Sequence, residues 1–476
     1  MVFSSAIFLF AFLPAVFLLY RVVPGQKAKN ILLAASSVVF YAFGQLEFVP
    51  LFLASVLINY LSGLALMRAD KRRKLFLALS VLLNIGILCY YKYTDFAIGN
   101  VNRVLGTAIP ARGIILPIGI SFFTFQGLSY SIDVYRDPAT GTRDPLKLLL
   151  YISFFPQLIA GPIVKYHDIS EQIDRRSCTP EQTAYGVRRF IVGLSKKILV
   201  ANALGYIVDR IFVEYIPAGV YDPRLMWLAA VCYTLQIYYD FSGYSDMAIG
   251  IGRMFGFTFR ENFEHPYGSS SIKEFWRRWH ISLSSWFKEY LYIPLGGNRR
   301  GRARTVLNKL IVFFCTGIWH GANWTFVLWG MLHGLLSSLE DIGAIPTKKL
   351  CRSKIGTLVS KLCTLLAVML LFVIFRSDSI TQAFAVISGM FAGAASPDGG
   401  YVLRTLLDPA AVFVLTAAVL LAGNIPVKIG RLVSETDSRR RAALEGLASV
   451  CCIALYALCM MSLARGGFNP FIYFQF

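Results

Sequence analysis

The chain has 476 residues, of which 56% are hydrophobic and only 16% are charged, and its formal net charge is +20. Soluble domains carry about 25% charged residues, so this composition excludes an ordinary soluble protein as well as a disordered or collagen-like chain. It predicts a polytopic membrane protein. The excess of Lys and Arg is then expected in cytoplasmic loops and not on a surface that binds nucleic acid.

Apolar segments recur along the whole chain. The first, residues 3–20, has no basic residue before it and no small-residue cleavage pattern, so we interpret it as a retained helix and not as a signal peptide. Further segments follow at 30–46, 48–67, 75–92, 114–132, 146–164, 186–213, 226–251, 306–337, 356–375, 409–427 and 444–464. Together they predict an all-α protein with about 11 transmembrane or re-entrant helices. We expect one integral membrane domain over residues 1–476.

Five basic runs indicate how these helices are oriented. They lie at residues 21–29, 68–74, 299–309, 348–361 and 428–441. Lys and Arg concentrate in the cytoplasmic loops of membrane proteins. Placing all five runs on the cytoplasmic side puts both termini on the extracytoplasmic side.

Two apolar segments carry residues that are unusual for a simple spanning helix. Segment 146–164 contains Pro156 and Gly161-Pro162, and segment 234–256 contains two aspartates and four glycines. Irregular backbone at membrane depth is tolerated only where it is buried in protein or lines a wet cavity. Asp240, Ser242 and Tyr244 are therefore candidates for cavity polarity, although a structural hydrogen-bond network explains them equally well.

Segment 272–291 is amphipathic at the helical period. Its apolar face collects Ile272, Phe275, Trp276, Trp279, His280, Leu283, Trp286, Phe287, Tyr290 and Leu291. We expect one helix that lies at the membrane interface with His280 on the buried face.

Segment 306–336 is too long for one straight span and is divided by Trp319-His320-Gly321. An ionisable residue between two apolar runs is a functional hypothesis by default, so His320 is the first candidate for chemistry. The alternative is a histidine satisfied by a neighbouring carbonyl or amide. His333 lies 13 residues further on, about 220° round a helix, so a continuous helix would not place the two on one face.

Several catalytic patterns are absent from the sequence. No histidine is followed by Asp five residues later, and the sequence has no G-x-S-x-G, G-x-x-x-x-G-K-[ST] or H-E-x-x-H motif. This argues against acyltransferases with the H-x4-D pattern, enzymes with a G-x-S-x-G nucleophile elbow, ATP-driven pumps and metal sites of the H-E-x-x-H type. We expect no metal site and no bound cofactor.

Segments 275–301 (FWRRWHISLSSWFKEYLYIPLGGNRRG) and 317–334 (GIWHGANWTFVLWGMLHG) carry a family resemblance. Together with 154–166, 238–257 and 468–476, they resemble the membrane-bound O-acyltransferase superfamily, in the bacterial branch that includes the alginate O-acetyltransferase membrane subunit. The histidines of the family match His320, in Trp-His-Gly, and His280, in Arg-Trp-His-Ile-Ser-Leu. The resemblance implies helices around a central tunnel in the bacterial cell membrane, which joins a cytoplasmic donor side to an outer acceptor side.

The resemblance also implies a reaction. An acetyl group would move from a cytoplasmic thioester, acetyl-CoA, to an extracytoplasmic polysaccharide, directly or through an exported SGNH-type acyltransferase. Because an imidazole titrates near pH ~6.5, it suits general-base work on a hydroxyl. We assign that role to His320, with His280 orienting the acceptor or donating a hydrogen bond to the carbonyl oxygen. Further substrate-binding candidates are Trp276, Trp279, Asn323 and Trp324.

Two alternatives stay open. The teichoic-acid branch would take D-alanine from an acyl-carrier protein. A transporter or flippase without acyl chemistry would also fit broken helices and a buried histidine.

Overall fold

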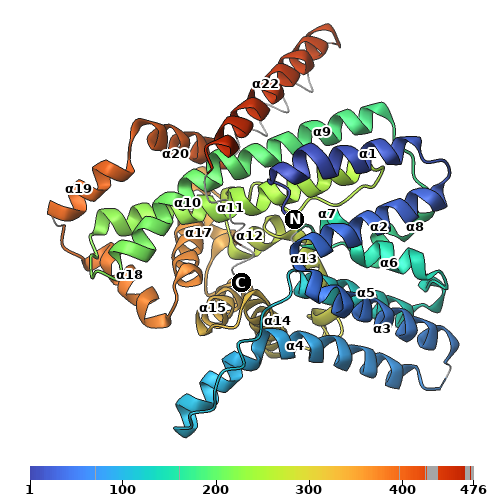
Figure 1. The fold of residues 1–476 in the computed structure, drawn as a ribbon. Coiled ribbons are helices and arrows are strands. Elements are labelled where there is room, and N and C mark those ends of the chain that lie inside the picture. The colour runs from blue at the N-terminus through green and yellow to red at the C-terminus, as the bar shows by residue number, and fades with distance from the viewer. Residues whose placement is uncertain are drawn as a thin grey trace. The chain divides into compact units, whose positions relative to one another are not determined.

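The computed structural model describes residues 1–69, 71–159, 161–395, 397–423, 425, 438–466 and 472. Helices follow one another along these residues and no strand occurs among them, which confirms the all-α class (Figure 1). The chain forms two compact units. The first unit is Met1–Phe190 with Tyr244–Glu261, and the second is Ile191–Gly243 with Asn262–Phe476.

In the described part of the chain, five helical stretches are long and apolar enough to cross a membrane. They are Gln26–Arg68, Arg73–Leu105, Pro180–Tyr215, Lys354–Arg376 and Ala443–Ala464. A sixth results if Asp398–Leu406 and Pro409–Ala422, which meet at 75°, count as one span. The chain is a multi-pass membrane protein. The sequence predicts about 11 transmembrane or re-entrant helices. That number stays a prediction, because several apolar segments form helices that are too short to cross a membrane alone.

The first unit holds the N-terminal helices. They are η1 (Phe8–Phe12), α1 (Leu13–Val22), α2 (Gln26–Gln45), η2 (Leu46–Phe48), α3 (Val49–Arg68), α4 (Arg73–Leu105), α5 (Ile120–Arg136), η3 (Pro138–Thr140), α6 (Pro145–Ser153), α7 (Phe155–Leu158), α8 (Tyr166–Asp174) and the start of α9 (Pro180–Ser195). Helices α3, α4 and α5 pack against one another.

Amide and hydroxyl side chains join α3, α4 and α5. Asn59 and Asn84 exchange hydrogen bonds of 3.0 and 3.1 Å between their side-chain amides. The Ser80 and Ser131 hydroxyls lie 2.9 Å apart, and Ser131 also donates to Asn59 Oδ1 at 3.3 Å. Interhelical hydrogen bonds of this kind hold membrane helices together because lipid supplies no hydrophobic force between them.

The second unit holds most of the remaining helices. They are η4 (Lys196–Ala201), α10 (Asn202–Asp209), η5 (Arg210–Tyr215), most of α11 (Pro223–Met254), η6 (Pro266–Gly268), α12 (Ile272–Arg278), α13 (Ile281–Phe287), η7 (Lys288–Tyr292), α14 (Arg302–His320), α15 (Trp324–Ile342), α16 (Thr347–Leu350), α17 (Lys354–Arg376), α18 (Ile380–Ala392), α19 (Pro397–Leu406), α20 (Pro409–Ala422) and α22 (Ser438–Ala464). The chain passes between the units inside α9 and α11.

Helices α14 and α15 form a tight pair, side by side in Figure 1. Glycines allow the close approach. A Cβ on Gly317 would lie 2.5 Å from the Phe326 carbonyl oxygen, and one on Gly330 would collide with the Phe313 carbonyl oxygen. Small residues at such crossings let two backbones meet directly.

Two expectations about helix continuity are wrong. Helix α11 runs without a break from Pro223 to Met254, so segment 234–256 is a regular helix despite its aspartates and glycines. Segment 272–291 is not one helix but α12, α13 and the π-helical turn η7, interrupted at His280. The expected break inside segment 146–164 is confirmed, since α6 ends at Ser153 and the four-residue α7 follows.

Candidate active site

His320 is the last residue of α14 and is 4% exposed. The helix stops because Gly321 leaves it in an extended conformation, with φ −176° and ψ 163°. A side chain at Gly321 would collide with the Phe326 ring, which packs there. Asn323 then begins α15, since its side-chain oxygen accepts a hydrogen bond of 3.1 Å from the Thr325 N–H.

Three aromatic rings enclose the His320 imidazole. The centroid distances are 5.0 Å to Trp319, 5.1 Å to Trp329 and 5.2 Å to Phe375. All three contacts are edge-to-face, with interplanar angles of 76°, 90° and 81°. This packing fixes the plane of the imidazole and limits the access of water to it.

His280 has a left-handed backbone conformation, with φ 45° and ψ 53°, and is fully buried. For a residue other than glycine this conformation is strained and persists only where neighbours impose it. Asn262 is that neighbour. Its carbonyl accepts from the Ile281 N–H at 3.0 Å, and its Oδ1 accepts from the Ser282 N–H at 3.1 Å.

Asn262 also selects the tautomer of His280. Its Oδ1 lies 3.3 Å from His280 Nδ1, and because an amide oxygen only accepts, Nδ1 carries the proton. The lone pair of the neutral ring is then on Nε2. Burial lowers the pKa of the His280 imidazole to about 3, which keeps this neutral form near pH 7.

The α14–α15 pair brings three histidines into one aromatic cluster. Trp319 contacts both His280, at 6.0 Å, and His320. Trp329 contacts both His320 and His333, the latter at 4.9 Å. The separation of about 220° that a continuous helix would give His320 and His333 does not apply, because α14 ends at His320 and α15 runs back along it.

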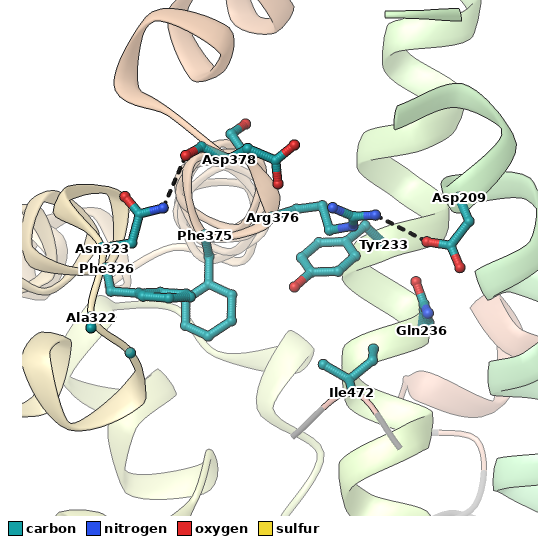
Figure 2. A pocket seen from close by; sticks show the side chains of 12 residues that line it. Asp209, Tyr233, Gln236, Ala322, Asn323, Phe326, Phe375, Arg376, Asp378 and Ile472 are labelled. Atoms are coloured by element: carbon teal, nitrogen blue, oxygen red, sulfur yellow. Dashed lines mark hydrogen bonds and ion pairs between the residues drawn. The ribbon is translucent and has the colours of Figure 1, made fainter. Parts of the chain in front are cut away.

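A polar cavity of about 380 Å³ lies beside this cluster (Figure 2). It is lined by Asp209, Tyr233, Gln236, Gly321, Ala322, Asn323, Phe326, Phe375, Arg376, Ser377, Asp378 and Ile472. Arg376 reaches across to Asp209 at 3.0 Å, and Asn323 Nδ2 donates to the Asp378 carbonyl at 2.9 Å. Two residues of the cavity wall adjoin His320. Gly321 follows it directly in the chain, and Phe375 packs on the His320 imidazole.

A second, mainly apolar pocket of about 180 Å³ lies in the same unit. It is lined by Trp276, Leu283, Ser284, Phe287, Lys288, Tyr292, Lys309, Val312, Phe313 and Thr316. Lys309 pairs with Asp341, which also pairs with Lys273. Burial opposes ionisation of the Asp341 carboxyl, but the hydrogen bonds from the two lysines outweigh it and lower the pKa.

Aromatic contacts connect the walls of the two cavities, which share no lining residue. Trp276 lines the apolar pocket and contacts Trp329 at 5.7 Å. Trp329 contacts Phe375 at 5.0 Å, and Phe375 lines the polar cavity. The rings that pack on His320 are therefore connected to the walls of both cavities. An open tunnel through these rings stays a prediction.

This arrangement holds a buried imidazole among aromatic rings that are connected to a polar cavity and to an apolar pocket. A model of the membrane-bound O-acyltransferase family matches residues 44–344. The chain belongs to this family. It is thus a membrane O-acyltransferase, and the Trp-His-Gly turn after α14 lies within the matched region.

Named relatives agree with the family. The "Probable alginate O-acetylase AlgI" of Azotobacter vinelandii is 37% identical over 518 aligned positions that cover all of both chains. The "Peptidoglycan O-acetyltransferase" of Helicobacter pylori is 35% identical over 82% of this chain and 80% of its own. A more distant relative, the "Teichoic acid D-alanyltransferase" of Bacillus subtilis, is 30% identical over 48% of this chain and 59% of its own.

The other candidate residues of this O-acyltransferase have varied surroundings. Trp276 lines the apolar pocket and Asn323 the polar cavity. Trp279 is 2% exposed and stacks on Phe275 at 5.4 Å, within the core. Trp324 is 45% exposed at the start of α15. Neither Trp279 nor Trp324 lines the polar cavity or the apolar pocket, and their roles in binding stay predictions.

The three polar candidates on α11 face other protein groups. Asp240 pairs with Lys197 at 2.6 Å and accepts from the Ile472 N–H at 2.8 Å, which fits the structural alternative. Ser242 is buried in the second unit, and Tyr244 belongs to the first unit, where it stacks on Phe3 at 4.6 Å. None of the three lines either cavity among the described residues.

Sequence reasoning missed Asn262, Lys197, Arg376 and the approach of His333. One local signal was present: Asn323 is a favoured residue at a helix start, so a new helix from Trp324 was readable. The partners of Asn262 and Lys197 lie 18 and 43 positions away (262 to 280, 197 to 240), and no local pattern identifies them.

Proposed function

We propose that this O-acyltransferase carries an acetyl group from a cytoplasmic thioester, acetyl-CoA, to a hydroxyl group, for the O-acetylation of an extracytoplasmic polysaccharide. Transfer occurs directly or through an exported SGNH-type acyltransferase. Two relatives that cover most of the chain are named as a probable alginate O-acetylase and a peptidoglycan O-acetyltransferase, which supports acetyl as the acyl group.

The observation that carries this proposal is the burial of His320 among aromatic rings that are connected to the walls of two unlike cavities. The polar cavity suits a hydroxyl-bearing acceptor. The Tyr233 hydroxyl and the Gln236 amide oxygen make no hydrogen bond within the described part of the chain, so both can bind a hydroxyl group. The apolar pocket, with Lys288 and Lys309 in its wall, suits the arm of a thioester with charged groups at its far end.

The reaction follows from these positions. His320 removes the proton of the acceptor hydroxyl as its oxygen attacks the thioester carbonyl carbon. The new C–O bond forms, the C–S bond breaks, and the proton passes from the imidazole to the leaving thiolate. A general base of this kind accelerates such a step by about 10²–10⁴-fold.

His280 orients the acceptor in this proposal. Its Nδ1–H is committed to Asn262, so its Nε2 lone pair accepts a hydrogen bond but cannot donate one to a carbonyl oxygen. This supports the first of the two roles inferred from the sequence. Trp319, between the two imidazoles, sets their spacing.

The orientation in the inner membrane is also part of the proposal. We place the five basic runs on the cytoplasmic side, with both termini outside; residues 428–437 of the last run and the C-terminal residues 473–476 lie outside the described part of the chain. The run at 299–304, which spans the start of α14, attracts the phosphates of the donor.

The test uses purified protein in liposomes with radiolabelled acetyl-CoA and polysaccharide extracted from the cell envelope. Wild type is expected to release CoA thiol and to label the polysaccharide or an added SGNH-type partner. His320→Ala is expected to fall to about 1% of this rate or less. Normal transfer by a folded His320→Ala protein would remove the general-base assignment.

The same assay separates the alternatives. D-alanyl transfer would need a D-alanyl carrier protein in place of acetyl-CoA. A transporter or flippase would move a solute without releasing any thiol. Mass spectrometry of surface polysaccharides from cells with and without the gene gives an independent readout: loss of O-acetyl groups supports the proposal, and unchanged O-acetylation contradicts it.

A further inference from the structure

His333 is buried at 0% exposure on α15, outside the acid–base chemistry described above. Aromatic rings surround its imidazole. Their centroids lie at 4.9 Å for Trp329, 5.2 Å for Trp276, 6.0 Å for Phe275 and 6.3 Å for Phe313. A polar ring in such surroundings is retained only if it makes a specific hydrogen bond.

That hydrogen bond is with Trp276, 57 positions earlier in the chain. The Trp276 indole N–H donates to His333 Nδ1 at 3.2 Å. An indole nitrogen only donates, so Nδ1 must carry the lone pair and the proton of the neutral ring is on Nε2. Protonation of Nδ1 would set two donors against each other, so the bond needs a neutral His333.

Trp276 itself is placed where its orientation matters. It lines the apolar pocket and contacts Phe313, another residue of that pocket, at 5.2 Å. On its other side it contacts Trp329, which packs on His320. A rotation of the indole would change the shape of the pocket and the packing of the aromatic rings around His320 together.

We propose that His333 is a positioning residue for the acyl transfer: through Nδ1 it holds the Trp276 indole in the wall of the apolar pocket. This rests on the proposed function, in which that pocket takes the thioester arm. His333 takes no proton in the reaction. Its action on the donor passes through Trp276.

Matched substitutions test this role. In His333→Asn, a side-chain oxygen stands close to the place of Nδ1 and can accept from the indole. In His333→Leu, a side chain of similar size cannot. We expect His333→Leu to raise the KM for acetyl-CoA about three- to tenfold, the loss of one buried hydrogen bond, with kcat changed less. His333→Asn should restore most of the affinity.

Trp276→Phe removes the donor of the same bond and should raise KM similarly. Combined with His333→Leu it should add little, because both changes break one interaction. Leu335→Ala, on the same helix and 46% exposed, controls for a general effect on α15. The proposal is overturned if His333→Leu leaves KM unchanged, if His333→Asn is as impaired as His333→Leu, or if the effects of the double variant multiply.

A spectroscopic readout keeps this test independent of the donor. Protein labelled with 5-fluorotryptophan gives a ¹⁹F signal for Trp276 that is assigned by its loss in Trp276→Phe. The signal should shift or broaden in His333→Leu and return toward wild type in His333→Asn. If wild type consumes no acetyl-CoA, the proposed function fails, whereas this signal still decides whether His333 holds Trp276. An unchanged signal in His333→Leu would overturn the inference.

Discussion

The two compact units bury polar side chains in different ways. In the first unit, Asn59, Asn84, Ser80 and Ser131 bond to one another across three helices. In the second unit, the His320 imidazole is enclosed by three aromatic rings, of which Phe375 lines a cavity. Polar groups that satisfy each other hold helices together, whereas a polar group kept beside a cavity is available to a substrate.

The second unit contains both kinds of burial. Asp240 and Lys197 form an ion pair on α11 and η4, with side chains 1% and 5% exposed. The two charges of this ion pair are directed at each other, whereas the His320 ring is enclosed by aromatic rings. Substitutions should therefore separate the two kinds of buried polar group. Changes at His320 should lower activity in a stable protein, whereas changes in the ion pair should lower stability first.

The largest effect on activity is expected at His320. His320→Ala should reduce acetyl transfer by about 10²–10⁴-fold, because the general base is lost. The thermal midpoint in detergent should change little, since the substitution leaves no buried charge. Turnover and thermal unfolding measured on the same preparation check this. An unfolded variant would show instead that His320 stabilises the fold, as the paired polar side chains do.

Lys197→Met should have the largest effect on stability. It leaves the Asp240 carboxylate buried without its cation, which costs about 3–5 kcal/mol when one partner of a buried pair is removed. The measurement is chemical unfolding in detergent. Lys197→Met with Asp240→Asn is the matched control and should recover most of the loss, because both charges are gone and the Ile472 N–H keeps an acceptor. Equal loss in the single and double variants would contradict the role of the pair.

Asn262→Ala should reduce kcat by about tenfold, the effect of one lost positioning contact on the acceptor. It removes the oxygen that fixes the His280 tautomer and its left-handed backbone. Ser282→Ala is the matched control, since it removes the hydroxyl contacts to the same oxygen, at 2.9 Å, and to His280 Nδ1, at 3.4 Å, but keeps the amide oxygen of Asn262. If Ser282→Ala lowers kcat as much as Asn262→Ala, the orientation of His280 is not the cause.

The smallest effect is expected at Asn59. Asn59→Leu should lower stability by about 1 kcal/mol, a typical value for an interhelical hydrogen bond in a membrane, and leave the turnover number unchanged. Asn59→Leu with Asn84→Leu should be no less stable than the single variant, because no amide is left without its partner. A fall in turnover at full stability would show that the first unit contributes more than structure.

The break at His320 shows how far sequence reasoning reached. An apolar run too long for one span, Trp-His-Gly in its middle and Asn323 beyond are all local features. The first two placed the division of the segment correctly, and the third would have placed the start of the next helix, whereas the catalytic role of His320 stays a prediction. The continuous helix expected through His280 was wrong, because its left-handed backbone depends on Asn262, a residue outside the periodic segment.

The sequence by itself determined the class of the protein. Composition and hydropathy report transfer of side chains from water to lipid, which each residue decides locally, so the membrane location and the helices were readable. Only the tertiary structure decided that His333 packs on Trp329, that Trp276 donates a hydrogen bond to His333, and that Asp240 forms an ion pair with Lys197. These pairings arise from the packing of helices distant in sequence, where the shape of both partners selects the contact and no single segment carries the information.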